Sequence, residues 1–135
     1  MTSLVELLRA PDLADAPYAY AATAPAGSRF IFLAGACPLA DDGSTAHPGD
    51  VVAQAQQCVE TLRGALDAAG AHLSDVISTR VLVASADRAD LHAAWKVVSA
   101  AFGDHDAPST LLGVTVLGYP DQLVEIEAVA AVAAT

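Results

Sequence analysis

The stretch VVAQAQQCVETLRGALDAAG occupies residues 51–70, and its apolar side chains recur every three or four residues, the spacing of an amphipathic helix. Asp50 precedes it as a predicted N-cap, and Gly70 closes it. The next segment, DVISTRVLVAS at residues 75–85, is rich in branched side chains that alternate along the chain, which predicts a strand. A helix that leads directly into a strand indicates a mixed architecture.

The other segments extend this pattern on both sides. A second amphipathic helix is predicted from a cap at Asp87 to Gly103. Four further strands are predicted at residues 18–24, 29–35, 110–118 and 123–132. The first two are expected to form a hairpin through residues 25–28, and the last two a hairpin through residues 119–122. The predicted fold class is therefore α+β, in the order β-β-α-β-α-β-β.

Length and charge narrow the class of protein. A chain of 135 residues fits one domain, residues 1–135, with residues 1–14 as an N-terminal extension. Six Lys and Arg stand against sixteen Asp and Glu, a formal charge of −10 that disfavours nucleic acid and anionic lipid as partners. The opening segment does not fit a signal peptide, and no apolar run approaches the ~20 residues of a membrane span. We expect a cytoplasmic protein with no membrane partner.

Two helices are too few to cover both faces of the sheet, so they are expected to pack side by side on one face. In LVEIEAVA, residues 123–130, a strand would direct Glu125 and Glu127 to the other face. That face is too mixed for a monomer core and too apolar for open water. We therefore expect it to be buried between subunits.

The cysteines and histidines give little indication of a catalytic thiol or a metal site. Cys37 and Cys58 have no CxxC spacing, which favours free thiols in a reducing compartment. Cys58 falls on the apolar stripe of the first helix and is predicted to be in the core, whereas Cys37 could be a cleft thiol or a packing residue. The histidines show no HxH or HxxxH spacing, so neither a metal site nor a cofactor is predicted.

The element order and five short motifs resemble those of the YjgF/RidA family, also labelled L-PSP endoribonuclease-like. The motifs are PYAYAA (17–22), FLAGACPL (32–39), LDAAGAHLSDV (66–76), APSTLLGV (107–114) and VEIEAVA (124–130). The resemblance covers roughly residues 15–132. It implies a chorismate-mutase-like fold, a homotrimer with clefts at the subunit boundaries, and hydrolysis of small enamines and imines in those clefts.

The same resemblance assigns individual positions. Glu125 matches the glutamate that positions the hydrolytic water, and Tyr18 matches a tyrosine of the cleft. Gly35 matches the glycine of the family segment corresponding to FLAGACPL and is a predicted ligand-binding residue, although Ala36 stands where a glutamine commonly follows it. Pro108 stands where deaminating members have an arginine that clamps the substrate carboxylate, so that clamp is absent from its family position.

Neighbouring polar residues could complete the site. Ser109 and Thr110 keep hydroxyl groups beside Pro108 that could hold a ligand. An ion pair is predicted between Arg80 and Glu127, which are expected on the same face of the sheet. Either Arg80 or Arg29 could replace the missing arginine.

The sequence is compatible with three functions. One is a hydrolase or deaminase with Glu125 as the catalytic residue and a small molecule as its substrate. The second is a module of the same family that binds a small molecule or assists a pathway without turnover. The third is a ribonuclease, which the acidic balance disfavours because the chain has no basic stripe.

Overall fold

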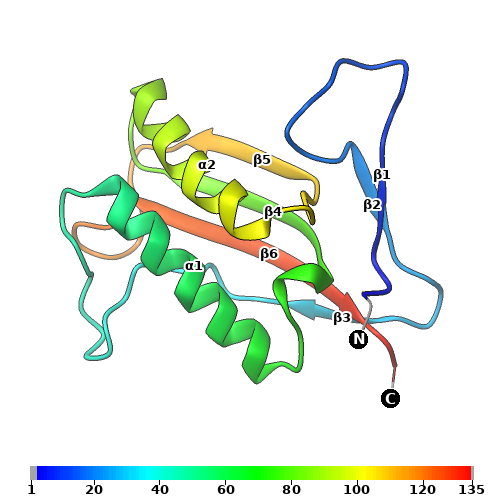
Figure 1. Cartoon of the computed structure of the whole chain (residues 1–135). Coiled ribbons are helices and arrows are strands. Elements are labelled where there is room, and N and C mark those ends of the chain that lie inside the picture. Colours follow the sequence, from blue (N-terminus) through cyan, green and yellow to red (C-terminus); the bar gives the residue numbers. More distant parts are fainter. Residues whose placement is uncertain (1–2, 135) are drawn as a thin grey trace.

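The computed structural model describes residues 3–134, and its helices and strands are labelled in Figure 1. Three strands come first: β1 (Glu6–Leu8), β2 (Ala21–Thr23) and β3 (Arg29–Phe32). They are followed by α1 (Val51–Ala68), a 3-10 turn η1 (Leu73–Asp75), β4 (Val76–Val83), α2 (Arg88–Phe102), β5 (Ser109–Gly113) and β6 (Val124–Val132). The predicted order is confirmed from β2 onward, and β1 and η1 are additional elements.

Both long helices begin and end where the sequence predicts. Asp50 and Asp87 each accept a hydrogen bond from a backbone N–H in the first turn, at 3.0 and 2.9 Å. Beyond the helix ends, Gly70 and Gly103 have φ angles of 79° and 56°. This left-handed conformation favours glycine, so these two residues stop the helices with little strain.

The helices form one layer and the main sheet forms the other. In Figure 1, α1 and α2 lie side by side over the same face of the sheet. The buried stripe of α1 includes Cys58, Leu62 and Leu66, and it packs in one cluster with Val81 of β4 and Ile126 of β6. The predicted α+β fold, with two helices on one face of a mixed sheet, is therefore confirmed, as is the core position of Cys58.

The main sheet has the strand order β3-β6-β4-β5. β6 runs antiparallel to both β3 and β4, whereas β5 runs parallel to β4. The predicted hairpin through residues 119–122 is therefore wrong, because β5 and β6 lie on opposite sides of β4. α2 is the crossover that makes β4 and β5 parallel, and residues 114–123 return the chain to the other edge of β4.

β5 is also shorter than the predicted strand 110–118. It ends at Gly113, where a Cβ atom would lie only 2.7 Å from the carbonyl oxygen of Ser85. This close backbone approach requires glycine at the point where the chain leaves the sheet.

The predicted hairpin between residues 18–24 and 29–35 is wrong as well. β2 pairs with β1 in a separate two-stranded sheet, and β3 pairs with β6. The pairing with β6 places Ile31 opposite Ala130 and buries it in the core. β2 carries only Ala and Thr side chains, so it has less apolar area to gain from a place in the main sheet.

The N-terminal segment is fastened to the loop before β5. β1 lies within the segment predicted as an N-terminal extension, and Arg9, just beyond it, forms an ion pair with Asp106. The backbone N–H of Ala19 donates to the carbonyl of Asp106 at 2.7 Å. The hydrogen bond from Arg9 lowers the pKa of the Asp106 carboxyl below its usual range. Asp106, as a carboxylate, therefore links the N-terminal segment to the loop before β5.

The face of the sheet opposite the helices carries a mixture of apolar and charged side chains. Phe30 is 51% exposed and Phe32 is 80% exposed. Glu125 and Glu127 lie on this same open face, because their neighbours Val124, Ile126 and Ala128 point into the core. None of the helices in the described part of the chain has the length and apolar content of a membrane span.

Candidate functional site

The carboxylate of Glu125 lies in a small polar cluster at the start of β6. Its Oε1 accepts two hydrogen bonds, one from the Cys37 thiol at 3.3 Å and one from Nε2 of Gln122 at 3.2 Å. Both donors are largely buried. Because both act on the same oxygen, they fix the carboxylate and leave Oε2 without a bond from either donor.

Gly35 makes room for that second oxygen. A Cβ atom at position 35 would lie 2.5 Å from Oε2 and 2.6 Å from the carboxyl carbon of Glu125. The neighbouring Ala36 exchanges backbone hydrogen bonds with Ile126 at 2.7 and 3.0 Å, so the two segments are held at this short separation. Glycine at position 35 is therefore required by the position of the Glu125 side chain.

Cys37 acts as a hydrogen-bond donor in this cluster. Burial and, to a smaller extent, the neighbouring carboxylate of Glu125 together raise the pKa of its thiol to about 11. At neutral pH the group is therefore a protonated thiol. Of the two alternatives left open by the sequence, the geometry favours packing and donation to Glu125 over a nucleophilic role.

Two glutamines that the sequence analysis missed hold the cluster in place. Gln122 accepts a hydrogen bond from the backbone N–H of Tyr119 at 3.0 Å, so both ends of its amide are engaged. Gln54, fully buried on α1, donates to the carbonyl of Asp121 at 2.9 Å and accepts from the N–H of Leu123 at 2.7 Å. Helix α1 thus fixes the loop that presents Gln122 and Glu125.

A second group of candidate residues borders a groove of about 290 Å³ at the start of β5. Tyr18, Pro108, Ser109 and Thr110 all line it, as does Arg80 of β4. The ring of Tyr18 meets that of Tyr20 edge to face, with centroids 5.9 Å apart. Four of the predicted ligand-binding residues are therefore brought together in one chain.

Ser109 and Thr110 point to opposite sides of the sheet. The hydroxyl of Thr79, on the helix side, donates to Oγ of Ser109 at 2.7 Å. Thr110 is the register partner of Arg80 and is exposed on the open face. Strand alternation explains the difference, and it means that only one of these two hydroxyl side chains faces the open side of the sheet.

The predicted ion pair is confirmed. Arg80 and Glu127 are cross-strand partners, and their charged atoms Nη1 and Oε1 lie 3.8 Å apart. Arg29 lies opposite Val132 at the far end of the sheet. Of the two arginines that could replace the missing family arginine, Arg80 is therefore the one beside Pro108 and Thr110.

The two groups of residues share a face of the sheet but lie apart. Glu125 on β6 is paired with Leu82 on β4. Thr110 lies on β5, the next strand beyond β4, and is paired with Arg80, two residues before Leu82. Ladder spacings place Glu125 and Thr110 about 12 Å apart. Gly35 and Cys37 belong to the Glu125 cluster, and Tyr18 to the groove.

The described residues 3–134 contain no group of three or more His, Cys, Asp or Glu side chains that could hold a metal ion. On the open face, the structure places the fixed carboxylate of Glu125, the hydroxyl of Thr110 and the paired guanidinium of Arg80. The fold and this site define a small α+β domain with the polar cluster around Glu125 on the open face of its sheet.

The comparison with known proteins identifies the family of this domain. The family model described as "Endoribonuclease L-PSP" matches residues 9–132, and the chain belongs to this family. The resemblance to YjgF/RidA proteins that the motifs indicate is therefore confirmed.

Several relatives align over most of their length. A RutC family protein of Pyrococcus horikoshii is 33% identical over 114 residues, which cover 84% of this chain and 86% of the relative. The 3-aminoacrylate deaminase RutC of Acinetobacter baylyi is 31% identical over 115 residues, covering 85% and 86%. A solved Rid-family protein of unknown function from Yersinia pestis has a TM-score of 0.88 at 27% identity, covering 96% of this chain and 99% of that one.

Proposed function

We propose that this protein is a cytoplasmic hydrolase that releases ammonia from a small enamine or imine, with Glu125 as its catalytic residue. One observation carries the proposal: two donors, Cys37 and Gln122, hold Oε1 of Glu125, and neither of them binds Oε2. A carboxylate fixed in this way is suited to hold and deprotonate a water molecule.

The reaction needs only water as a co-reactant. An enamine first takes a proton on carbon and loses one from nitrogen, which gives the imine. As water oxygen attacks the C=N carbon, Glu125 accepts a proton from the water and passes it to the nitrogen, which gives a carbinolamine. Glu125 then moves the hydroxyl proton of the carbinolamine to the nitrogen as the C–N bond breaks, and the products are a carbonyl compound and ammonia. The relative named 3-aminoacrylate deaminase supports chemistry at a C=C–N unit.

The site is proposed to be complete only in a homotrimer. Within one chain, Glu125 and the groove around Pro108 are separated by about 12 Å of sheet surface. The exposed rings of Phe30 and Phe32 would gain apolar burial if the open face packed against a second copy. A cleft at that boundary would combine Glu125 of one subunit with Tyr18 and Thr110 of its neighbour.

The proposed substrate carries less negative charge than an imino acid. Pro108 supplies neither a charge nor a donor, and the nearby Arg80 already faces Glu127. The formal net charge of −10 on the chain adds to the repulsion of anions. A neutral amide or ester of an enamino acid fits these conditions better than the free enamino acid.

Ammonia release from freshly generated imines and enamines tests this function. Glu125→Gln keeps the size of the side chain but removes the base, so we expect a loss of activity of about a hundredfold or more. Glu60→Gln is the matched control, because Glu60 is exposed on α1 far from the open face. Equal rates in the two variants, or no turnover with neutral and anionic substrates alike, would refute the proposal.

A second candidate is a binding protein of the same family without turnover. Pro108 favours it, because the position expected to anchor an anionic substrate has lost its donor. This function predicts that a metabolite raises the melting temperature in a saturable way without being consumed.

A further inference from the structure

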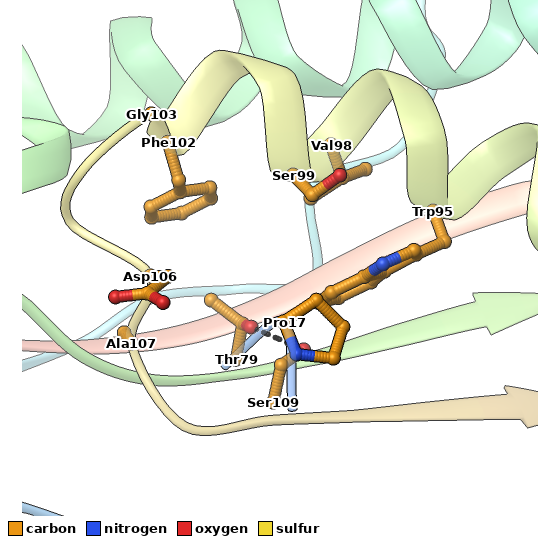
Figure 2. Close-up of a pocket in the computed structure, with 10 residues that line it drawn as sticks. All are labelled: Pro17, Thr79, Trp95, Val98, Ser99, Phe102, Gly103, Asp106, Ala107 and Ser109. Atoms are coloured by element: carbon orange, nitrogen blue, oxygen red, sulfur yellow. Dashed lines mark hydrogen bonds between the residues drawn. The ribbon is translucent and has the colours of Figure 1, made fainter. Parts of the chain in front are cut away.

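A cavity of about 190 Å³ lies on the helix side of the sheet, between α2 and the starts of β4 and β5. Figure 2 shows its lining, to which α2 contributes Trp95, Val98 and Phe102. Pro17 closes one side next to the indole of Trp95, and Thr79 and Ser109 lie on the strands below. The sheet separates this space from the open face that carries Glu125.

The size of the cavity suits one aromatic ring. An apolar cavity of about 150 Å³ is known to hold a benzene molecule and to stay dry otherwise. The present cavity is slightly larger, so it has room for a ring with a short substituent. The flat indole of Trp95 and the ring of Phe102 offer surfaces against which such a ring can pack.

The floor of the cavity can bind one polar group. Thr79 and Ser109 share a single hydrogen bond of 2.7 Å, which uses one of their two hydroxyl protons. The other proton has no acceptor among the described residues 3–134, and both oxygens keep accepting capacity. A ligand oxygen that reaches this pair would therefore find a donor.

The rim of the cavity disfavours anions. Asp106 lines it, and the hydrogen bond from Arg9 keeps the pKa of that carboxyl low, so it is charged at neutral pH. The guanidinium that could have attracted a carboxylate is already engaged in this ion pair. A neutral molecule meets no such penalty.

A more open hollow of about 390 Å³ adjoins the cavity and shares Pro17, Trp95 and Ser109 with it. Tyr18 and His92 line its outer part. The shared residues place this hollow beside the cavity, as a route by which a small molecule can reach Trp95 from solvent.

We propose that this cavity is a second small-molecule site, which takes a neutral aromatic compound with one hydrogen-bonding substituent. It shares Thr79 and Ser109 with the groove around Pro108, and its entrance shares Tyr18, but none of its lining residues belongs to the Glu125 cluster and binding there does not depend on hydrolysis. Trp95 is the only tryptophan of the chain, so its fluorescence reports directly on occupancy.

Titration with benzyl alcohol and with benzoate tests the site, because the two probes share a ring and differ in charge. We expect benzyl alcohol to change the Trp95 emission in a saturable way and to raise the melting temperature. Benzoate is expected to bind at least about tenfold more weakly. A change that grows linearly without saturation, or equal affinity for benzoate, would overturn the proposal.

Variants locate the binding to this cavity. Ser99 lines it from α2, so Ser99→Phe is expected to fill the space and abolish the response, whereas Ser99→Ala keeps the space and the response. Ser109→Ala removes the floor hydroxyl whose proton is free, and it is expected to weaken benzyl alcohol about three- to tenfold while leaving toluene unchanged. Full binding by a folded Ser99→Phe protein, or equal losses for both ligands in Ser109→Ala, would contradict the assignment. If Ser99→Phe fails to fold, Ser109→Ala and the benzoate comparison decide it.

Discussion

The carboxylate of Glu125 fills the space in which a side chain at position 35 would begin, since a Cβ atom on Gly35 would lie 2.5 Å from its Oε2. The glycine and the glutamate are ninety positions apart in the chain, yet each determines what the other can be.

Gly35→Ala should displace the end of the Glu125 side chain without unfolding the protein. The obstructed atoms belong to the far end of a flexible side chain, so the loss in the free energy of unfolding is expected to stay near 1 kcal/mol. The displaced carboxylate no longer faces the Cys37 thiol, and the pKa of that thiol should fall. Thiolate absorbance during a pH titration measures this fall, and Ala34→Gly is a control next to it in the chain.

Cys37 should make the folded state sensitive to alkaline pH. Its pKa is raised from the ordinary value of 9.0 to about 11 in the folded chain. Between these values the unfolded chain releases a proton that the folded chain keeps. The stabilising contribution is therefore complete below about pH 9 and lost as pH rises through about 11.

The same effect can be isolated by substitution. Cys37→Ala should lose stability less steeply with rising pH than the parent protein, by on the order of 1 kcal/mol across this interval. Chemical denaturation at several pH values measures the difference. Parallel curves for the two proteins would show that Cys37 does not contribute.

Gln54→Leu should destabilise the fold strongly. The change removes the buried partner of the partly buried N–H of Leu123 and of the carbonyl of Asp121, at a cost of about 2–4 kcal/mol. Gln56→Leu is the matched control, because Gln56 is exposed on the same helix. Equal denaturation midpoints for the two variants would show that the loop before β6 does not need Gln54.

Glu127→Gln should release Arg80 to bind anions. The pair is half-exposed, so its loss is expected to change stability by less than about 1 kcal/mol. Affinity for small carboxylates such as acetate should rise about two- to fivefold, since the guanidinium no longer faces a carboxylate. Calorimetry on the single variant and on a double variant that adds Arg80→Gln, which should show no gain, checks the cause.

Phe32→Glu should prevent the self-association proposed for the open face. Phe32 is 80% exposed on the isolated chain, so a charge there costs the monomer little but would be buried in an oligomer. Light scattering should report a smaller particle for this variant than for the parent. A parent protein that is itself monomeric would contradict the proposed trimer.

The helices and the face that each strand buries were predictable from local sequence. The apolar stripe from Val51 and the caps Asp50 and Asp87 are properties of neighbouring residues. The pair between Arg80 and Glu127 followed from alternation alone, once both segments were taken as strands of one sheet. Such features need no knowledge of which strand lies next to which.

The partners of the strands were not predictable in the same way. Two consecutive strands with turn residues between them look like a hairpin, and nothing local shows that β6 will occupy the centre of the sheet. Gln54 and Gln122 were missed for a related reason. A glutamine on a helix or in a loop is usually exposed, and only the tertiary fold shows that these two hold the Glu125 cluster.

The alternation along β5 has a further consequence. Pro108, Ser109 and Thr110 form one short stretch of backbone, yet Ser109 borders the space under α2 while Thr110 belongs to the opposite surface. This short stretch therefore contributes to the walls of both spaces, so a substitution of Ser109 alters the lining on both sides of the sheet.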